Sequence, residues 1–315
     1  MKIVLLESLG VPDALIDELA APLLAAGHTF VRYDRTEDEA ALIRQCEGAD
    51  VLMLANMPLA GRVIRACESV KFIDIAFTGV DHVDLDAAKE IGAAVSNAAG
   101  YSTQAVAELT IAQALALLRN VPAVDARCRN GGTKAGLVGR ELRACTVGII
   151  GTGAIGLRTA QLARAFGSRV IAYAPRPKAA AEGLVEYVPL DELLQTADIV
   201  CLHCPLNGET RGMIGKDQLA MMKQDAYLIN MARGPVVDSD ALADALNEGR
   251  IAGAAIDVFE KEPPLDTAHP LLHAKNCMVT PHIAFASEQS MEERARIVFR
   301  SLEKWMAGEQ INVIL

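Results

Sequence analysis

The sequence predicts an α/β protein with two Rossmann-like domains, each built on a doubly wound parallel sheet. Strand-like and helix-like segments alternate along almost the whole chain, which predicts right-handed βαβ crossovers. A glycine run at 151–156 stands between one such strand and the helix that follows it. Hydrophobic residues make up 51% of the 315 residues and aromatic residues only 4%, so we expect cores of Ala, Val, Ile and Leu. A chain of this length can bury two such cores.

The first third of the chain is expected to form one of these domains. Short apolar runs predict four strands, at 3–6, 50–55, 71–76 and 92–97. Helical periodicity with an early proline predicts a helix over 12–26. Because helical segments separate the strands, the strands are expected to pair in parallel.

The segment at 102–120 differs from the other predicted helices because it is apolar on nearly every face. Such a helix is buried on every side, and we expect it to connect the two domains and to pack against a second subunit. Glu108, Thr110 and Gln113 interrupt it, which excludes a membrane-spanning helix. The polar, glycine-containing stretch at 127–143 is expected to be a loop.

A second α/β set follows this loop. Its predicted strands lie at 146–150, 169–173, 199–202, 226–230 and 253–257. Its predicted helices lie at 155–166, 190–196 and 239–247. A last helical stretch at 287–306 is too short to form a third domain.

The glycine run Gly151-Thr152-Gly153-Ala154-Ile155-Gly156 has the preceding strand and following helix that a dinucleotide-binding loop requires. The first glycine allows a tight turn, the second lets the backbone approach a pyrophosphate, and the third lets the helix pack closely on the strand. The free N–H groups at the helix N-terminus then bind the phosphates. We therefore expect a nicotinamide dinucleotide here rather than a simple glycine turn.

The residue expected to bind the adenosine ribose is not acidic. A carboxylate usually ends the next strand of an NAD-binding fold, but here that position is Ala174, and the following residues include Arg176 and Lys178. Without the carboxylate a 2′-phosphate is not repelled, and Arg176 or Lys178 can pair with it. The sequence therefore favours NADP(H), although Arg176 stacked on the adenine would allow both cofactors.

Net charge and cysteine content limit the partners and the compartment. The formal net charge is −10, which argues against nucleic acid or an anionic membrane as a partner. No stretch approaches the roughly 20 apolar residues that span a bilayer, and the N-terminus does not resemble a signal peptide. Seven scattered cysteines favour a cytoplasmic protein over a disulfide framework. Cys201 and Cys204 form a single C-x-x-C in an apolar run, which we interpret as a buried strand, and we expect no metal site.

Three further segments carry charged or titratable residues to the ends of predicted strands. One strand is followed by Arg233, the next by Asp257 and Glu262, and the last by His282. The carboxyl ends of the strands form the ligand-binding edge of an open α/β sheet. We therefore expect these four side chains to converge at that edge.

With these segments, the chain resembles the D-isomer-specific 2-hydroxyacid dehydrogenase family over essentially its whole length. The motifs that carry the resemblance are Phe77-Thr78-Gly79-Val80-Asp81, Asn97-Ala98-Ala99-Gly100-Tyr101-Ser102, the glycine run, Cys204-Pro205-Leu206 and the three strand ends just described. The family's catalytic Arg, Glu and His match Arg233, Glu262 and His282. The resemblance implies a homodimer in which an NAD(P)-binding domain, at 100–285, is inserted into a flavodoxin-like substrate domain formed by 1–99 and 286–315.

The implied reaction is the reversible NAD(P)H-dependent reduction of a 2-oxo acid to the D-2-hydroxy acid. Arg233 can hold two substrate oxygens with its planar fork, and His282 can protonate the ketone oxygen while Glu262 orients its ring. The implied substrate-binding residues are Thr78, Gly79, Val80 and Tyr101. The expected dinucleotide contacts are Gly151, Thr152, Gly153, Ala154, Ile155, Gly156, Ala174, Arg176, Lys178, Cys204, Pro205, Thr210, Met231, Ala232, Asp257, His282 and Ala284.

Other functions on the same fold are weighed against this one. A glyoxylate or hydroxypyruvate reductase would be a specialisation of the same reaction. Oxidation of formate or phosphite needs the same Arg and His, but the Glu262 match and the absence of long insertions favour the hydroxyacid reaction. A dinucleotide-sensing corepressor, an interaction protein, would be expected to carry partner-binding extensions. The apolar residues near 56–59, with Phe77, Tyr101 and Phe285, favour a substrate without a second charge.

Overall fold

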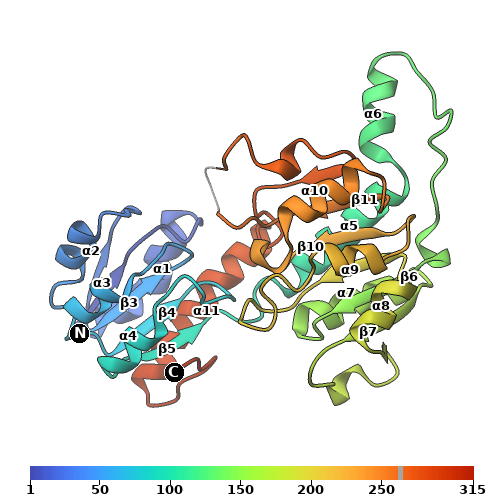
Figure 1. Ribbon diagram of the computed structural model, residues 1–315. Coiled ribbons are helices and arrows are strands. Elements are labelled where there is room, and N and C mark those ends of the chain that lie inside the picture. The colour runs from blue at the N-terminus through green and yellow to red at the C-terminus, as the bar shows by residue number, and fades with distance from the viewer. Residues whose placement is uncertain (262–264) are drawn as a thin grey trace. The chain divides into compact units, whose positions relative to one another are not determined.

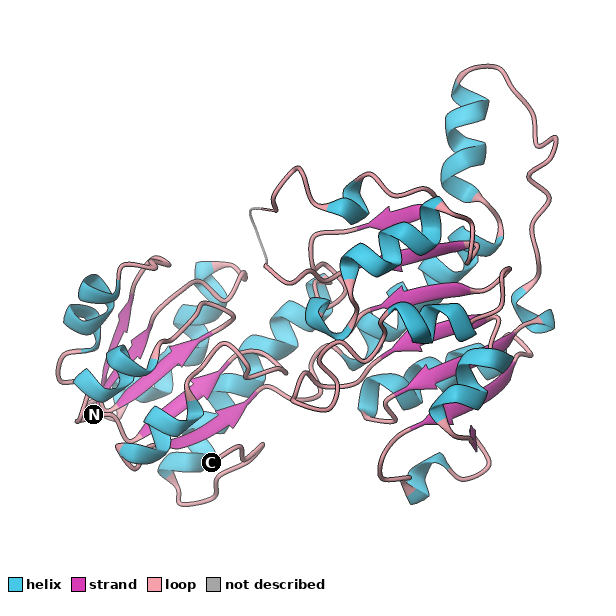
Figure 2. Ribbon diagram, in the orientation of Figure 1, coloured by secondary structure: helices cyan, strands magenta, loops and turns pink. Residues whose placement is uncertain are grey.

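Two parallel sheets organise the part of the chain that the structure describes, which is every residue except 262–264. The structure is a computed structural model, shown in Figures 1 and 2. The chain forms two units: unit 1 comprises Met1–Ser102 and Ala286–Leu315, and unit 2 comprises Thr103–Phe285. The sequence places the two boundaries at 99/100 and 285/286. Two α/β units built on parallel sheets confirm the predicted fold class.

Unit 1 has a sheet of order β2-β1-β3-β4-β5 in the described residues, which is the flavodoxin-like order. Its strands are β1 (Lys2–Leu5), β2 (Thr29–Arg32), β3 (Val51–Leu54), β4 (Phe72–Ile75) and β5 (Ala94–Asn97). Its helices are α1 (Asp13–Ala25), α2 (Glu39–Cys46), α3 (Gly61–Ala66), α4 (Leu85–Glu90) and α11 (Glu288–Met306). The last helix returns to this sheet, where Trp305 stacks on Phe72 with ring centroids 4.7 Å apart.

Unit 2 has a sheet of order β12-β11-β10-β9-β6-β7-β8 among its described residues. The strands are β6 (Thr146–Ile150), β7 (Arg169–Tyr173), β8 (Glu186–Tyr187), β9 (Ile199–Leu202), β10 (Tyr227–Asn230), β11 (Gly253–Ile256) and β12 (Cys277–Val279). The chain proceeds from β6 to β7 on one side and continues with β9 on the other. The carboxyl end of β6 is therefore a topological switch point, where such sheets bind their ligands.

Helices cover both faces of the unit 2 sheet. They are α5 (Thr103–Leu118), α7 (Ala154–Ala165), α8 (Leu190–Thr196), α9 (Lys216–Met221) and α10 (Ser239–Asn247), with short 3₁₀ turns η1 (Leu142–Ala144), η2 (Ala179–Ala181), η3 (Gly234–Val236) and η4 (Pro270–Leu272). A further helix, α6 (Val121–Arg129), follows α5 and has no buried residue. Alternation along β6 shows the two layers, because Ile149 packs with α5 and α7 whereas Ile150 packs with α8, α9 and α10. Both faces are covered, which explains why the strands are continuous apolar runs.

Two sequence predictions need correction here. The apolar helix α5 begins at the boundary between the units and packs on α7, β10 and β11. It is not buried on every face, however, because Gln104, Glu108 and Ala112 are exposed. The predicted loop at 127–143 begins inside a helix, because α6 extends to Arg129. None of the α6 residues is buried, so this helix has no apolar periodicity for sequence analysis to detect. Figure 1 shows α6 and the chain after it projecting from the rest of unit 2. In the described residues, no helix has the length and hydropathy needed to cross a membrane.

Candidate active site

The glycine loop joins β6 to α7 at the topological switch point. Gly151 has a φ of +99°, and a Cβ there would lie 2.7 Å from the backbone of His203 and Cys204. A Cβ on Gly156 would lie 2.0 Å from the carbonyl oxygen of Gly151. By contrast, a Cβ on Gly153 would meet no heavy atom of the described residues within 4 Å. The first and third glycines are thus required by the protein's own packing, whereas the second faces open space.

The first turn of α7 has backbone donors available beside this open space. Gly153 is the N-cap residue, and no side chain of the described residues caps the helix. The first main-chain bond of the helix runs from Leu157 N–H to the Gly153 carbonyl, at 2.9 Å. The N–H groups of Ala154, Ile155 and Gly156 therefore point out of the helix end, which carries a partial positive charge. These groups fit a pyrophosphate.

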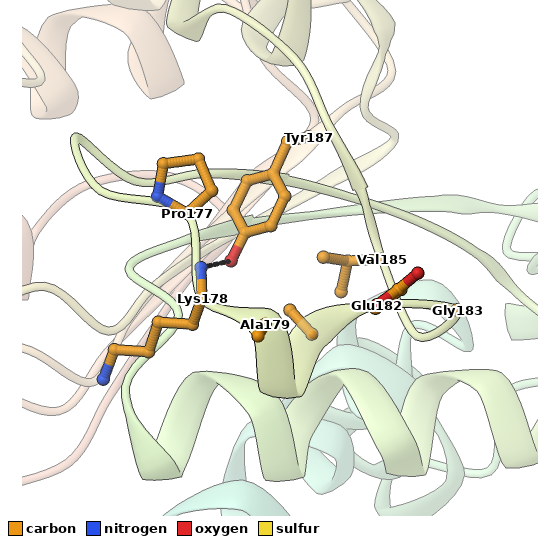
Figure 3. Close-up of a pocket in the computed structure, with 8 residues that line it drawn as sticks. Pro177, Lys178, Ala179, Glu182, Gly183, Val185 and Tyr187 are labelled. Atoms are coloured by element: carbon orange, nitrogen blue, oxygen red, sulfur yellow. Dashed lines mark hydrogen bonds between the residues drawn. The ribbon is translucent and has the colours of Figure 1, made fainter.

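The adenosine end of the predicted site lies after β7. Ala174 follows that strand, and both Arg176 and Lys178 are exposed. Tyr187 of β8 bonds to two segments here: its hydroxyl accepts a hydrogen bond from the Lys178 backbone N–H at 3.1 Å and donates one to Thr152 Oγ1 at 2.8 Å. Figure 3 shows the first of these bonds. Sequence analysis does not single out Tyr187, because a lone tyrosine on an edge strand carries no motif.

The end of β9 lies beside the glycine loop, because the His203 N–H donates to the Ile150 carbonyl at 2.8 Å. Burial lowers the pKa of His203 to about 4, so its ring is neutral. Its two ring nitrogens are buried and meet no hydrogen-bond partner in the described residues. Burial raises the pKa of Cys201 to about 12 and that of Cys204 to about 11, so both remain thiols. Cys201 thus lies in the buried strand that the sequence predicts, whereas the equally neutral Cys204 is buried just after its end.

Thr210 acts inside the loop that follows β9. Its hydroxyl donates to the Pro205 carbonyl at 2.6 Å and accepts from the Asn207 N–H at 2.9 Å. Thr210 therefore fixes the course of the chain after Cys204.

Arg233 follows β10 in a turn held by Asn230. The buried Asn230 side chain donates to the Arg233 carbonyl at 3.0 Å and accepts from the Ala232 N–H at 3.0 Å. The Arg233 guanidinium donates through Nη1 to the Ala232 carbonyl at 2.8 Å. The next residue, Gly234, allows a close approach, since a Cβ there would lie 2.0 Å from the Phe259 carbonyl carbon. The turn is thereby packed against the chain that follows β11.

Asp257 holds the turn that carries His282. Its buried carboxylate accepts hydrogen bonds from Thr280 Oγ1 at 2.5 Å, from the Ile283 N–H at 2.9 Å and from the Ala284 N–H at 2.8 Å. Its carbonyl accepts from the His282 N–H at 2.7 Å. Burial raises the pKa of Asp257 in spite of these donors.

These bonds matter because His282 has a φ of +54°. A non-glycine residue in this region costs on the order of 1–3 kcal/mol, and the surrounding structure must enforce it. His282 also makes an edge-to-face contact with Phe285, with ring centroids 5.2 Å apart. Asp257 therefore fixes the backbone of the predicted general acid.

Glu262, the predicted partner of His282, lies outside the described residues. The neighbouring Glu260 is described, and it contacts His269 Nε2 at 3.0 Å and accepts a hydrogen bond from the Ser239 hydroxyl. Burial would raise the pKa of Glu260, but these two partners outweigh it and the pKa is lowered. Glu260 is thus a carboxylate that holds the start of this segment to α10 and η4.

The predicted residues of unit 2 are brought to one edge of its sheet. Gly151, His203, Arg233, Asp257 and His282 come after strands β6, β9, β10, β11 and β12, which all run parallel. Main-chain bonds join neighbouring members, such as Asp257 N–H to the Asn230 carbonyl at 3.1 Å. The described residues contain no group of three or more His, Cys, Asp or Glu side chains placed to hold a metal ion.

The predicted substrate-binding residues of unit 1 follow β4 and β5. The Asn97 side chain donates to the Thr78 carbonyl at 2.7 Å, which fixes the turn that continues with Gly79 and Val80. The ring of Tyr101 is buried, 6.3 Å from that of Phe77. This edge of unit 1 therefore places the turn at 78–80 directly after one member of an aromatic pair.

Arg294 adds a positive charge to this edge that sequence analysis does not predict. It comes from α11, lies over the Tyr101 ring at 5.8 Å from its centroid, and donates to the Leu9 carbonyl at 2.5 Å. Burial lowers its pKa, which attraction to Tyr101 and Glu7 partly offsets. The sequence pattern suggests apolar surroundings for Tyr101, but Arg294 makes these surroundings partly polar.

Comparison with known proteins gives consistent results across the chain. Residues 111–284 match the family model described as D-isomer specific 2-hydroxyacid dehydrogenase, NAD binding domain. D-3-phosphoglycerate dehydrogenase of Methanocaldococcus jannaschii is 40% identical over 304 residues, which are 95% of this chain and 57% of that protein. This chain therefore spans little more than half the length of that relative.

Two other similarities extend over whole chains. Hydroxypyruvate reductase of Blautia hydrogenotrophica is 35% identical over 326 residues, covering 100% of this chain and 99% of that protein. Among solved structures, an acyclic imino acid reductase in complex with NADPH and D-Arg has a TM-score of 0.90 at 28% identity and covers 100% of both chains.

Proposed function

This chain belongs to the D-isomer-specific 2-hydroxyacid dehydrogenase family, and we propose from its site that it reduces a 2-oxo acid to the D-2-hydroxy acid with a reduced nicotinamide dinucleotide. Membership confirms the resemblance that the sequence motifs indicate. The chain is an oxidoreductase of CH–OH groups, as its relatives are named. The residue roles, the substrate and the choice of dinucleotide are proposals.

The observation that best supports the proposal is the buried Asp257 carboxylate under the His282 turn. Three hydrogen bonds to one carboxylate hold a histidine in a left-handed backbone conformation that it would otherwise avoid. Strain of this kind persists where a side chain must be presented at a fixed position. An imidazole is well suited to donate a proton near neutral pH.

The glycine loop supplies the second support. The open space at Gly153 and the N–H groups of the first α7 turn fit the pyrophosphate of a dinucleotide. When bound, the reduced nicotinamide supplies the hydride that the ketone carbon accepts. His282 donates a proton to the ketone oxygen, which completes the alcohol and balances the charge. We propose that Glu262, which lies outside the described residues, orients the ring of His282, as the family resemblance implies.

Arg233 and the turn at 78–80 are proposed to bind the substrate. The guanidinium of Arg233 can donate two parallel hydrogen bonds to substrate oxygens, which a lysine cannot do. The backbone N–H groups of Thr78, Gly79 and Val80, in unit 1, are proposed to bind the substrate carboxylate. Tyr101 lies beside them as a wall for the substrate side chain.

Among 2-oxo acids, we propose that a small, polar one is the substrate. The full-length similarity to a hydroxypyruvate reductase and the similarity to glyoxylate reductases favour such a substrate.

The proposal is tested by measuring turnover of a panel of 2-oxo acids with NADH and with NADPH. The panel contains glyoxylate, hydroxypyruvate, pyruvate, phenylpyruvate and a branched 2-oxo acid. We expect at least one member to be reduced, with the highest kcat/KM for glyoxylate or hydroxypyruvate. A preference for phenylpyruvate would refute the small-substrate candidate, and no turnover of any member would refute the reaction.

For the dinucleotide we propose a preference for NADP(H). Ala174 leaves no carboxylate to repel a 2′-phosphate, and the exposed Arg176 and Lys178 follow it. One structural relative, the acyclic imino acid reductase, was solved in complex with NADPH. A strong kinetic preference for NADH would refute this choice.

We also propose a homodimer in the cytoplasm. The α6 helix has no buried residue, and the side chains of Val121 and Val138 are 51% and 80% exposed, so a second copy could cover them. All seven cysteines lie in the described residues and are free thiols, which suits a reducing compartment. Light scattering on the purified chain tests the dimer, and Val121→Asp is expected to weaken it.

A further inference from the structure

Tyr187 joins two loops that are both proposed to contact the dinucleotide, one after β6 and one after β7. It is the last residue of β8, the strand beside β7 at one edge of the unit 2 sheet. Its hydroxyl accepts from the Lys178 backbone N–H at 3.1 Å and donates to Thr152 Oγ1 at 2.8 Å. Lys178 belongs to the loop after β7, and Thr152 lies inside the glycine loop. One hydroxyl group therefore connects the pyrophosphate loop to the loop proposed to read the ribose.

The loop after β7 has few other anchors. A cavity of about 380 Å³ lies against it, lined by Pro177, Lys178, Val185 and Tyr187 among others (Figure 3). Residues 175–180 are exposed, and Ala181 is the first buried residue after them. No hydrogen bond found in the described residues involves 174–177, so the position of this loop depends strongly on the bond from the Lys178 N–H to Tyr187.

Thr152 makes the connection sensitive to a bound ligand. Its side chain is buried between Gly151 and Gly153, and its oxygen accepts the Tyr187 hydroxyl proton. A threonine hydroxyl also has a proton to donate, and within the described residues this proton has no acceptor among the hydrogen bonds found. Tyr187 thus orients a hydroxyl group within the loop proposed to bind the pyrophosphate.

We propose that Tyr187 is a positioning residue for cofactor choice. Through the Lys178 backbone and Thr152, it holds the loop at 175–178 against the glycine loop, so that Arg176 can pair with a 2′-phosphate on the adenosine ribose. The inference rests on the proposed function, because it requires a dinucleotide on the glycine loop. Tyr187 contacts neither the hydride donor nor the substrate in this proposal, so it affects binding rather than chemistry.

The test is a double-mutant cycle on binding. Dissociation constants for NADPH and NADH are measured by nucleotide fluorescence for the full chain and for Tyr187→Phe, Arg176→Ala and the double variant. Tyr187→Phe removes only the hydroxyl. We expect it to weaken NADPH binding about 3- to 10-fold, the loss typical of one hydrogen bond, and NADH binding less than about twofold. In the Arg176→Ala background its effect on NADPH should fall below about twofold.

Tyr227→Phe is the matched control, because Tyr227 is half-buried at the start of β10, an interior strand of the same sheet that β9, β6 and β7 separate from β8. Tyr227→Phe should leave both dissociation constants unchanged. In Tyr187→Phe, kcat at saturating NADPH should be unchanged, because Tyr187 affects binding rather than chemistry. Equal weakening of both cofactors, or additive effects of Tyr187→Phe and Arg176→Ala, would overturn the inference. A chain that binds NADH but gains nothing from the 2′-phosphate also overturns it and leaves the proposed reduction intact. Failure to bind either dinucleotide would overturn the proposed function as well.

Discussion

Alanine substitutions at Gly153 and Gly156 should separate cofactor binding from folding. A Cβ on Gly156 would lie 2.0 Å from the Gly151 carbonyl oxygen and 3.1 Å from its carbon, so the backbone must shift to admit it. Overpacking of this kind costs about 1–3 kcal/mol. We therefore expect Gly156→Ala to lower the free energy of unfolding by at least that much.

Gly153→Ala should behave in the opposite way. The Gly153 φ is −70°, which alanine adopts without strain, and no described atom lies within 4 Å of the added Cβ. The smaller entropy of the unfolded chain stabilises the variant by about 0.4–1 kcal/mol, and the loss of a glycine N-cap offsets part of this. The free energy of unfolding should thus change by less than about 1 kcal/mol. The new methyl group would occupy the space proposed for the pyrophosphate, so the dissociation constant for NADH or NADPH should rise at least about tenfold, or about 1.4 kcal/mol.

Denaturant unfolding and nucleotide fluorescence titration on the same preparations measure both quantities. If Gly153→Ala binds the dinucleotide as tightly as the unmodified chain, the pyrophosphate does not lie at this loop. A loss of more than about 2 kcal/mol of stability in Gly153→Ala would show that the open space is filled by protein.

Three other substitutions test the remaining parts of the account. His282→Ala should lower kcat about 10²- to 10⁴-fold and leave the dissociation constant of the dinucleotide within a few-fold, and near-full activity would refute its role as general acid. Asp257→Asn cannot accept all three hydrogen bonds, so thermal unfolding should show a loss of about 1.5–3 kcal/mol together with lower kcat, whereas the exposed Asp244→Asn should change neither. The pKa of Asp198 is lowered because the Thr146 N–H, Arg140 and Lys223 outweigh its burial. The ionised carboxylate therefore stabilises the folded chain above the ordinary Asp pKa of about 3.9, and this contribution is lost as pH falls through the folded pKa. The stability difference between the unmodified chain and Asp198→Asn should therefore be largest near neutral pH and shrink below about pH 4, and a difference that does not depend on pH would contradict this assignment.

The sequence predicts the central strands of the unit 2 sheet well because they are buried on both faces, whereas the short edge strand β8, which has no buried residue, is missed. The runs at 146–150, 169–173 and 199–202 coincide with β6, β7 and β9. Continuous apolar runs of this kind need no alternation to be recognised. The strand β2 is missed because Thr29–Arg32 lies at a sheet edge with no fully buried residue, and its composition is mixed. The α6 helix is missed for a related reason, since none of its residues is buried.

The candidate site likewise contains residues that local sequence patterns identify and residues that they do not. Motifs identify Gly151, Arg233 and His282 because strand ends and glycine spacing are local properties of the chain. The bond from Tyr187 to Thr152 and the contact of Arg294 with Tyr101 join residues far apart in sequence, and no local pattern encodes them. Asp257 is an intermediate case: its sequence position predicts the ligand edge, but only the structure shows its carboxylate holding the His282 turn.

The configuration of the product is the most direct test of the proposed reaction. The purified chain is incubated with a 2-oxo acid that it turns over and with a reduced dinucleotide, and the product is resolved by chiral chromatography. The account predicts the D-2-hydroxy acid alone, formed in equal amount to the dinucleotide oxidised. An L or racemic product, or no hydroxy acid from any 2-oxo acid although the dinucleotide binds, would contradict it.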